Sequence, residues 1–202
     1  MASHRRTLDR RSSSRCLLSC VFFFLGSSLH VNCYPGDILK HGEFFSESGT
    51  LVSAEGTFEL RFFTTRSNTT SSKIFLGICY KWDRDTVVWV ANRDDPLPAD
   101  FTGVFRIAED GNLKVLDSST GKEYWSTNLD RSSSTNRTVK LMDSGNLVLS
   151  NDDNMETSLW ESFKDPTDTF LPGMKMDEKL TLTSWPKGKD DPRSERYTFK
   201  LD

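Results

Sequence analysis

Carboxylates are the side chains of this sequence with the widest chemical scope. Neighbouring acids recur along the chain, as Asp94/Asp95, Asp152/Asp153 and Asp165/Asp168. A glycoside hydrolase needs only two carboxyl groups about 5 to 9.5 Å apart, so the residue type alone permits this chemistry. Adjacent Asp residues in loops rich in Gly and Asn are, however, typical turn formers exposed to solvent. We therefore expect none of these acids to be catalytic.

Histidine, the usual general base, is scarce in this chain. It occurs only as His4, His30 and His41, and only His41 lies beyond the first 30 residues. A Ser-His-Asp or Cys-His arrangement would depend on that one side chain. The sequence also lacks a Gly-rich phosphate loop and any cluster with the spacing of metal ligands. It predicts a protein without enzymatic activity, cofactor or metal.

Residues 1–33 have the features of a secretory signal. Five Arg, ending at Arg15, form a basic region, and residues 17–25 (LLSCVFFFL) form an apolar one. Small residues follow, and cleavage is expected after Ser28 or after Cys33. Nine unbroken apolar residues cannot cross roughly 30 Å of hydrocarbon as a helix. We therefore expect a secreted protein with no membrane anchor in this chain.

The mature chain is expected to be acidic and poor in cysteine. The formal net charge is −3, and removing the leader takes away five Arg and only Asp9. An acidic surface argues against nucleic acid and anionic lipid as partners. Beyond the leader only Cys33, at its border, and Cys79 remain, so no disulfide framework is predicted. The apolar run IFLGICY around Cys79 indicates a buried thiol.

Two N-glycosylation sequons lie in polar runs. They are Asn68-Thr69-Thr70 and Asn136-Arg137-Thr138. Such runs are typical of exposed loops, and in a chain with a secretory leader the two sequons support each other. We predict N-linked glycans on Asn68 and Asn136.

Beyond the leader the pattern is that of an all-β protein. Apolar residues make up 36% of the chain and aromatic residues 11%, so burial depends on large rings. Short apolar runs alternate with Gly, Asn, Asp and Ser clusters, and no long segment has the helical period. The candidate strands are TFELRFF, KIFLGICYKW, TVVWVAN, VFRIAED, NLKVLD, KEYWSTN, VKLMD, NLVLSN and TSLWESF. Asp110-Gly111 and Ser144-Gly145 are predicted to form tight turns.

An internal repeat organises these strands. EDGNLKVLDSSTGKEYWSTN recurs as MDSGNLVLSNDDNMETSLWESF, and a fainter first copy runs from AEGTFELRFF, with Gly56 at its turn, to TVVWVAN. Trp89 and Trp125 are 36 residues apart, and Trp125 and Trp160 are 35 apart. Each unit is too small to bury its own face, so we expect three units to share one core around a pseudo-threefold axis.

The repeated tryptophans have two interpretations. Their rings could stack on sugars, but equivalent positions in three units should point at a shared axis. We therefore assign Trp89, Trp125 and Trp160 to the core. Asn92 and Asn128 follow the first two Trp at the same offset, which indicates a repeated turn or backbone hydrogen bond.

From residue 164 onward proline and charge interrupt the pattern. Asp165-Pro166-Thr167-Asp168 has the composition of a turn, while LTLTSW and RYTFKLD are candidate edge strands. The chain ends at Asp202 within an alternating run. We expect residues 164–202 to be a linker and the start of a truncated β-rich region.

The order of these motifs resembles one plant family. GTLVSAEGTFELRFF, FLGICYKW, TVVWVANRDDPL, GNLKVLD, YWSTN, VKLMDSGNLVLSN, LWESFKDPTDTFLPGMKMD and LTSWPKGKDDP are similar to segments of the G-type (bulb-type) lectin S-receptor-like proteins, which are relatives of the S-locus glycoproteins. The resemblance implies a β-prism II bulb-type lectin domain over residues 36–163, followed by the start of an S-locus glycoprotein region. The family's EGF-like and PAN modules, membrane helix and Ser/Thr kinase have no counterpart in this chain, so no kinase activity is expected.

The resemblance also suggests sugar-binding positions. Mannose-binding bulb lectins use a Q-x-D-x-N-x-V-x-Y strand. The corresponding residues are Ser53, Glu55, Thr57, Glu59 and Arg61 in the first unit, Ala108, Asp110, Asn112, Lys114 and Leu116 in the second, and Met142, Ser144, Asn146, Val148 and Ser150 in the third. Only Asp110, Asn112, Asn146 and Val148 match, and these are the predicted carbohydrate-binding residues. Each lost polar contact costs about 1 to 3 kcal/mol, so the mannose sites are degenerate. The alternative for Asp110 and Asn112 is a hairpin turn.

The function implied is that of a carbohydrate-binding-type recognition module of a plant receptor-like protein, active in the apoplast or at the cell surface. It would sense a ligand for self-recognition or defence signalling. The alternative is a secreted structural or protein-interaction glycoprotein of the cell wall that binds no sugar. Expected partners are a glycan or protein ligand, and a second copy or another receptor, because bulb lectins often exchange a terminal strand.

Overall fold

The computed structural model describes residues 36–65, 72–130, 136–151, 155, 157–178, 180–184 and 197–200. The predicted leader, Cys33 and the sequon residue Asn68 lie outside this part of the chain. No helix in the described part has the length and apolar character that a membrane span requires.

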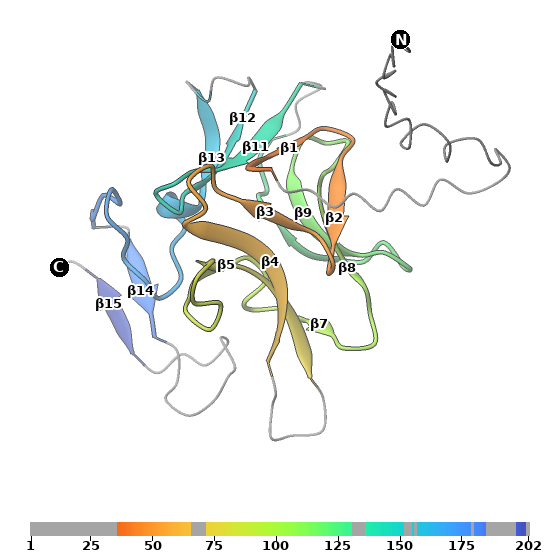
Figure 1. The fold of residues 1–202 in the computed structure, drawn as a ribbon, viewed down its shortest axis with the longest axis horizontal. Coiled ribbons are helices and arrows are strands. Elements are labelled where there is room, and N and C mark those ends of the chain that lie inside the picture. The colour runs from red at the N-terminus through yellow and green to blue at the C-terminus, as the bar shows by residue number, and fades with distance from the viewer. Residues whose placement is uncertain are drawn as a thin grey trace, which may run out of the picture. The chain divides into compact units, whose positions relative to one another are not determined.

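Three antiparallel sheets, one for each repeat, form the body of the structure (Figure 1). The first unit contains β3 (Thr50–Val52), β4 (Phe58–Thr65), β5 (Lys73–Tyr80) and β6 (Val87–Val90), in that order, and β7 (Leu97–Pro98) also pairs with β5. The second unit has the order β10 (Glu123–Ser126), β9 (Leu113–Asp117), β8 (Gly103–Ile107) and β2 (Phe44–Ser46). The third has the order β1 (Ile38–Lys40), β11 (Thr138–Leu141), β12 (Leu147–Ser150) and β13 (Ser158–Glu161). This architecture confirms the all-β, three-unit β-prism prediction.

The first described strands connect the three units. β1 pairs with β11, β2 with β8 and β3 with β4, so residues 38–52 supply one edge strand to every sheet. The middle side chains of these strands, Leu39, Phe45 and Leu51, are at most 1% exposed. They belong to one core cluster that draws on all three sheets. Because each sheet is completed or extended by this segment, no unit is independent of the others.

The three repeated tryptophans meet in one cluster. Trp89 in β6, Trp125 in β10 and Trp160 in β13 pack edge to face, with ring centroids 5.5 to 5.7 Å apart. This geometry is favourable for aromatic pairs because the positive edge of one ring faces the negative face of the next. The Trp89 indole N–H also donates a 2.8 Å hydrogen bond to the Asp165 carbonyl oxygen. The rings therefore join the units to one another and to the segment that follows them.

The segment after β13 packs against the lectin sheets. It begins with the 3₁₀ turn η1 (Ser162–Lys164), and its side chains Leu171 and Met174 belong to the core cluster. The buried Arg93 guanidinium donates to the carbonyl oxygens of Thr183 and Ser184 at 2.9 and 3.0 Å. The two candidate edge strands form a ribbon of β14 (Thr181–Thr183) and β15 (Thr198–Lys200).

Cys79 lies in β5 and is buried, as its sequence context predicts. Burial raises the pKa of its thiol to about 11, because the thiolate loses its hydration. Its S–H donates to the Glu59 carbonyl oxygen at 3.6 Å. The thiol is therefore expected to be unreactive near neutral pH.

Candidate functional site

The three units share one turn, and the predicted sugar-binding residues flank it. Gly56, Gly111 and Gly145 have φ of 74°, 81° and 85°, a region that glycine enters at little cost. Each donates its N–H to the carbonyl oxygen three residues before it, namely that of Ser53, Ala108 or Met142, at 2.8 to 2.9 Å. The turn in the first unit is longer by one residue, since Ser53 N–H bonds Phe58 whereas Ala108 N–H bonds Asn112.

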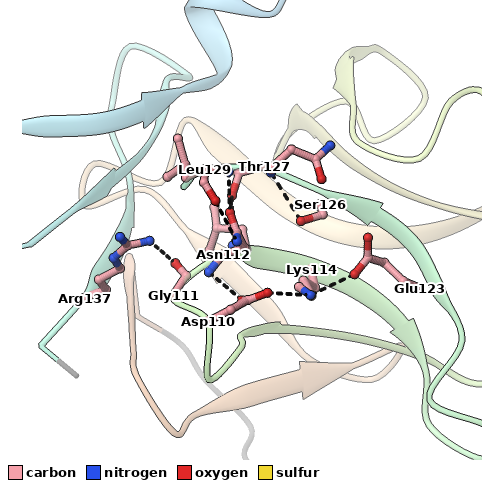
Figure 2. Close-up of polar contacts among 11 residues, drawn as sticks. Asp110, Gly111, Asn112, Lys114, Glu123, Ser126, Thr127, Leu129 and Arg137 are labelled. Atoms are coloured by element: carbon pink, nitrogen blue, oxygen red, sulfur yellow. Dashed lines mark hydrogen bonds and ion pairs between the residues drawn. The ribbon is translucent and has the colours of Figure 1, made fainter. Parts of the chain in front are cut away.

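Asn112 in the second unit is buried, with 4% of its surface exposed. Its Oδ1 accepts hydrogen bonds from the Thr127 hydroxyl at 2.9 Å and the Leu129 N–H at 2.7 Å. Its Nδ2 donates to the Leu129 carbonyl oxygen at 3.3 Å (Figure 2). The amide therefore fastens the β8–β9 turn to the chain that leaves β10, and little of its hydrogen-bonding capacity is left for a ligand.

Asp110 lies at the same turn and faces the cation of its own strand. Its Oδ1 accepts the Asn112 N–H at 3.0 Å, and its Oδ2 is 2.8 Å from Lys114 Nζ. Lys114 also pairs with Glu123 at 2.9 Å, so one ammonium bridges two carboxylates (Figure 2). Lys114 stands where the mannose motif has Val, and it supplies Asp110 with an internal partner in place of a sugar hydroxyl.

The Asp110–Lys114 pair gives a pH-dependent prediction. Burial opposes ionisation, but the Lys114 ammonium and the Asn112 N–H hold the Asp110 pKa below its ordinary value. A lowered pKa means that the pair stabilises the fold above the ordinary pKa of Asp, and that this stability is lost as pH falls through the folded value. We expect Lys114→Met to raise the Asp110 pKa, as measured by carboxyl NMR titration.

The stability difference between Lys114→Met and the wild type should also vanish at acid pH. The matched control is Lys140→Met, which removes the lysine paired with Asp37 in the third unit at 3.4 Å. It should leave the Asp110 pKa unchanged. An Asp110 pKa that is the same with and without Lys114 would contradict the ion-pair description.

Arg137 supports the second turn from below. It is 3% exposed, and its Nη1 donates to the Gly111 carbonyl oxygen at 2.6 Å (Figure 2). A Cβ on Gly111 would lie 2.5 Å from the guanidinium, so only glycine fits this contact. The adjacent sequon residue Asn136 is exposed. Its glycosylation stays a prediction.

Asn146 in the third unit repeats the arrangement of Asn112. Its Oδ1 accepts the Ser162 hydroxyl and the Phe163 N–H, both at 3.2 Å. Ser162 Oγ in turn accepts the Leu147 N–H at 2.9 Å, as Thr127 Oγ1 accepts the Leu113 N–H at 3.2 Å. The two units thus share an asparagine-hydroxyl clasp that sequence analysis missed. Its signal is a hydroxyl residue two positions after the repeated Trp.

Asn146 differs from Asn112 because it borders a hollow. A groove of about 610 Å³ lies beside the third unit, and it is lined by Ser144, Asn146, Glu161, Phe163, Lys164, Gly173, Lys175, Asp177 and Leu180. One wall comes from the β11–β12 turn and β13, and the other from residues 173–180. Val148, the fourth predicted sugar-binding residue, is 6% exposed, pairs with Glu161 across β12 and β13, and does not line the groove.

The groove presents charges of both signs. Glu161 accepts hydrogen bonds from Lys164 Nζ at 2.7 Å and from Asn146 Nδ2 at 3.1 Å. Burial disfavours the charged carboxylate, but these donors and the Ser158 hydroxyl keep the Glu161 pKa below its ordinary value. Glu161 is therefore an ionised acceptor at neutral pH, beside the exposed Lys175 ammonium. Such an edge can exchange hydrogen bonds with hydroxyl groups.

The first unit uses its polar groups internally. Ser53 Oγ accepts the N–H groups of Thr57 and Phe58 at 3.2 and 3.1 Å. The buried Glu59 carboxylate pairs with Arg84, whose Nε and Nη2 lie 2.9 and 3.1 Å from its oxygens. These contacts stabilise the sheet and its turn.

Asn92 and Asn128, which share an offset from Trp, have different roles. Asn92 is buried, accepts the Leu76 N–H at 2.8 Å and donates to the Ile74 carbonyl oxygen at 3.1 Å. Asn128 instead adopts a left-handed φ of 51° at a turn. The prediction of a backbone bond or a turn therefore describes both residues, but not one repeated structure.

The acid pairs considered for catalysis lie apart from this groove. Asp94 and Asp165 border a polar hollow of about 260 Å³ together with Arg93 and Trp125. Burial raises the pKa of Asp165, and the Asp94 carboxylate adds to the effect. Within the described ranges, no cluster of three or more His, Cys, Asp or Glu could hold a metal ion. The absence of catalysis, cofactor and metal stays an expectation.

Comparison with known proteins adds independent information. Residues 86–185 match the family described as D-mannose binding lectin. A G-type lectin S-receptor-like serine/threonine-protein kinase of Arabidopsis thaliana is 49% identical over 81% of this chain and 18% of its own length. The S-locus-specific glycoprotein S6 of Brassica oleracea is 44% identical over 78% of this chain and 37% of its own. The chain thus spans about a fifth of the length of the receptor kinases that it matches.

Two solved structures are similar in fold. The Japanese Marasmius oreades lectin aligns with a TM-score of 0.45 at 16% identity, over 63% of this chain and 90% of its own. A monomeric monocot mannose-binding lectin from Gastrodia elata aligns with a TM-score of 0.43 at 23% identity, over 63% of this chain and 96% of its own.

Proposed function

The chain belongs to the plant family of G-type lectin S-receptor-like proteins and S-locus glycoproteins, and from this membership we propose that it is an extracellular recognition module that binds a glycan. It acts in the apoplast or at the cell surface. There it senses a ligand for self-recognition or defence signalling. Any kinase step belongs to a different part of the longer receptors.

The groove beside the third unit carries this proposal. Its rim combines the Ser144 hydroxyl with the charged groups of Glu161 and Lys175, and Phe163 and Leu180 add an apolar surface. A pyranose has the complementary character, because its hydroxyls donate and accept at the edge while its C–H groups form an apolar face. Sites for small ligands typically combine an apolar lining with a few convergent polar groups. The groove meets that description, whereas the second turn is closed by Lys114.

A glycan array tests the proposal. We expect the secreted, glycosylated protein to bind specific oligosaccharides, and Lys175→Ala and Glu161→Gln each to weaken the affinity about tenfold, the scale of one lost polar contact. Affinities would be measured by titration calorimetry on the best array ligand. Lys200→Ala removes an exposed lysine of β15 and serves as the matched control. Silence of a folded sample on the array, or unchanged affinities in both groove variants, would contradict the proposal.

One observation favours the alternative of a structural or protein-interaction glycoprotein that binds no sugar. In the second unit, Asn112 and Asp110 are engaged by Leu129, Thr127 and Lys114. A protein selected only for scaffolding would keep these contacts for stability. This alternative predicts a stable, cooperative fold together with a silent glycan array.

A further inference from the structure

Trp82 is an exposed aromatic side chain that neither the core nor the groove uses. It lies in the loop between β5 and β6, and 75% of its surface is exposed. In the described part of the chain the other exposed large apolar residues are Phe44, Phe170, Tyr197 and Phe199. Exposing an indole of this size forfeits the stabilisation that burial would give. Its position therefore suggests a role outside folding.

The Trp82 ring is held in place before any ligand arrives. It packs on Tyr80 with ring centroids 5.1 Å apart, and Tyr80 packs on the buried Phe58 at 4.9 Å. The loop is braced as well, since Lys81 N–H bonds the Thr57 carbonyl oxygen at 3.0 Å and Asp83 Oδ2 accepts the Thr86 hydroxyl at 2.6 Å. A side chain that is already ordered pays little conformational entropy on binding.

The surroundings of Trp82 are charged. Lys81, Arg84 and Asp85 in the same loop are all exposed. A protein interface is typically marked by a contiguous apolar patch of several residues, which this loop does not supply. A single apolar ring surrounded by polar groups is complementary to a pyranose whose hydroxyls are mostly equatorial. Such a sugar leaves one ring face apolar while its edge bonds to charged side chains.

The aromatic stack adjoins the turn that lines the groove. A Cβ on Gly145 would lie 3.0 Å from the Phe58 ring, and Ser144 beside it lines the groove. The Glu55 N–H also donates to Asp143 at 2.7 Å, which joins the turns of the first and third units. Two ring-to-ring steps, from Phe58 to Tyr80 and from Tyr80 to Trp82, therefore separate the groove turn from the exposed indole.

We propose that Trp82 is a stacking subsite for one pyranose ring of an oligosaccharide whose other residues occupy the groove beside the third unit. The inference rests on the proposed glycan-binding function and names its ligand class, an oligosaccharide of equatorially substituted pyranoses. Because the subsite lies beyond the groove, it contributes to binding of a chain and not of a monosaccharide.

The probes are β-1,4-linked hexasaccharides of glucose, mannose and xylose, each compared with its monosaccharide by titration calorimetry. For the hexasaccharide that binds, we expect Trp82→Ala to weaken affinity about tenfold and Trp82→Phe to restore most of it, because stacking on an aromatic ring contributes on this scale. Affinity for the monosaccharide should not change. Tyr197→Ala, which removes a ring that is 76% exposed on another segment, should have no effect.

Two outcomes overturn the inference in distinguishable ways. If Trp82→Ala binds the hexasaccharide like the wild type while Glu161→Gln binds it more weakly, the groove function stands and the subsite is wrong. If the wild type binds none of the three hexasaccharides, the subsite is also wrong, and the wider glycan array decides the proposed function separately.

Discussion

Trp89→Ala is expected to lower the free energy of unfolding by about 4 kcal/mol, within the range for removing a buried large aromatic side chain. Trp89 is 3% exposed and contacts both Trp125 and Trp160, with ring centroids 5.7 Å away in each case. Its indole N–H holds the Asp165 carbonyl oxygen at 2.8 Å. The substitution therefore opens a cavity between the units and releases the segment that follows them.

Urea or guanidinium denaturation, followed by circular dichroism, measures this loss. Trp82→Ala is the matched control, since it removes the same side chain at 75% exposure and should change stability by no more than about 0.5 kcal/mol. Trp89→Phe keeps a ring but loses the N–H donor, so it should fall between the two. Equal small losses for Trp89→Ala and Trp82→Ala would show that the tryptophan cluster does not join the units.

Asn112→Ala should cost about 2 to 4 kcal/mol of stability. The side chain is 4% exposed and bonds the Leu129 N–H, the Leu129 carbonyl oxygen and the Thr127 hydroxyl. Leaving buried partners without a hydrogen bond costs about 1 to 3 kcal/mol for each unsatisfied group, less whatever relaxation and water recover. The turn before β9 and the chain after β10 would then separate.

The same denaturation experiment checks this value, with Asn151→Ala at an exposed position as the control. The sequence motif makes the opposite prediction for Asn112, namely a weaker glycan affinity in a fold of unchanged stability. That combination of results would assign Asn112 to ligand binding and overturn its structural role.

Much of the fold follows from local sequence signals. β8 and β9 show strict alternation, in which Phe105, Ile107, Leu113 and Val115 are buried and the intervening residues are only partly buried. Glycines with positive φ mark the repeated turns. Both signals depend on neighbours in the sequence, so they survive without tertiary information.

The strands β1, β2 and β3 were not predicted because each has only three residues and one fully buried side chain. A run this short has no measurable period. Its strand conformation comes from pairing with distant partners, such as Leu39 opposite Val139. Tertiary pairing, and not local propensity, therefore decides these elements.

The candidate site was predictable only in part. The motif identified Asn112 and Asn146, but their hydrogen bonds to Thr127 and Ser162 join residues 15 and 16 positions away. The bridge from Lys114 to Asp110 and Glu123 likewise depends on the pairing of β9 with β10. No pattern in one strand reveals such contacts.

The groove itself has no signature in the sequence. Its second wall comes from residues 173–180, which the sequence places in a linker. Leu171 and Met174 bring that wall into place by packing into the core cluster. Single apolar residues between proline and charge give no periodic signal, so the role of this segment emerges only from the structure.

The most direct test of the account is an NMR titration of the ¹⁵N-labelled protein with the best oligosaccharide from the glycan array. The account predicts that chemical shift changes concentrate on the groove residues Ser144, Asn146, Lys164 and Lys175 and on the Trp82 indole N–H, while Asp110 and Asn112 stay unperturbed. Changes centred on Asp110, Asn112 and Lys114, with the groove unaffected, would contradict it and return the binding site to the second unit.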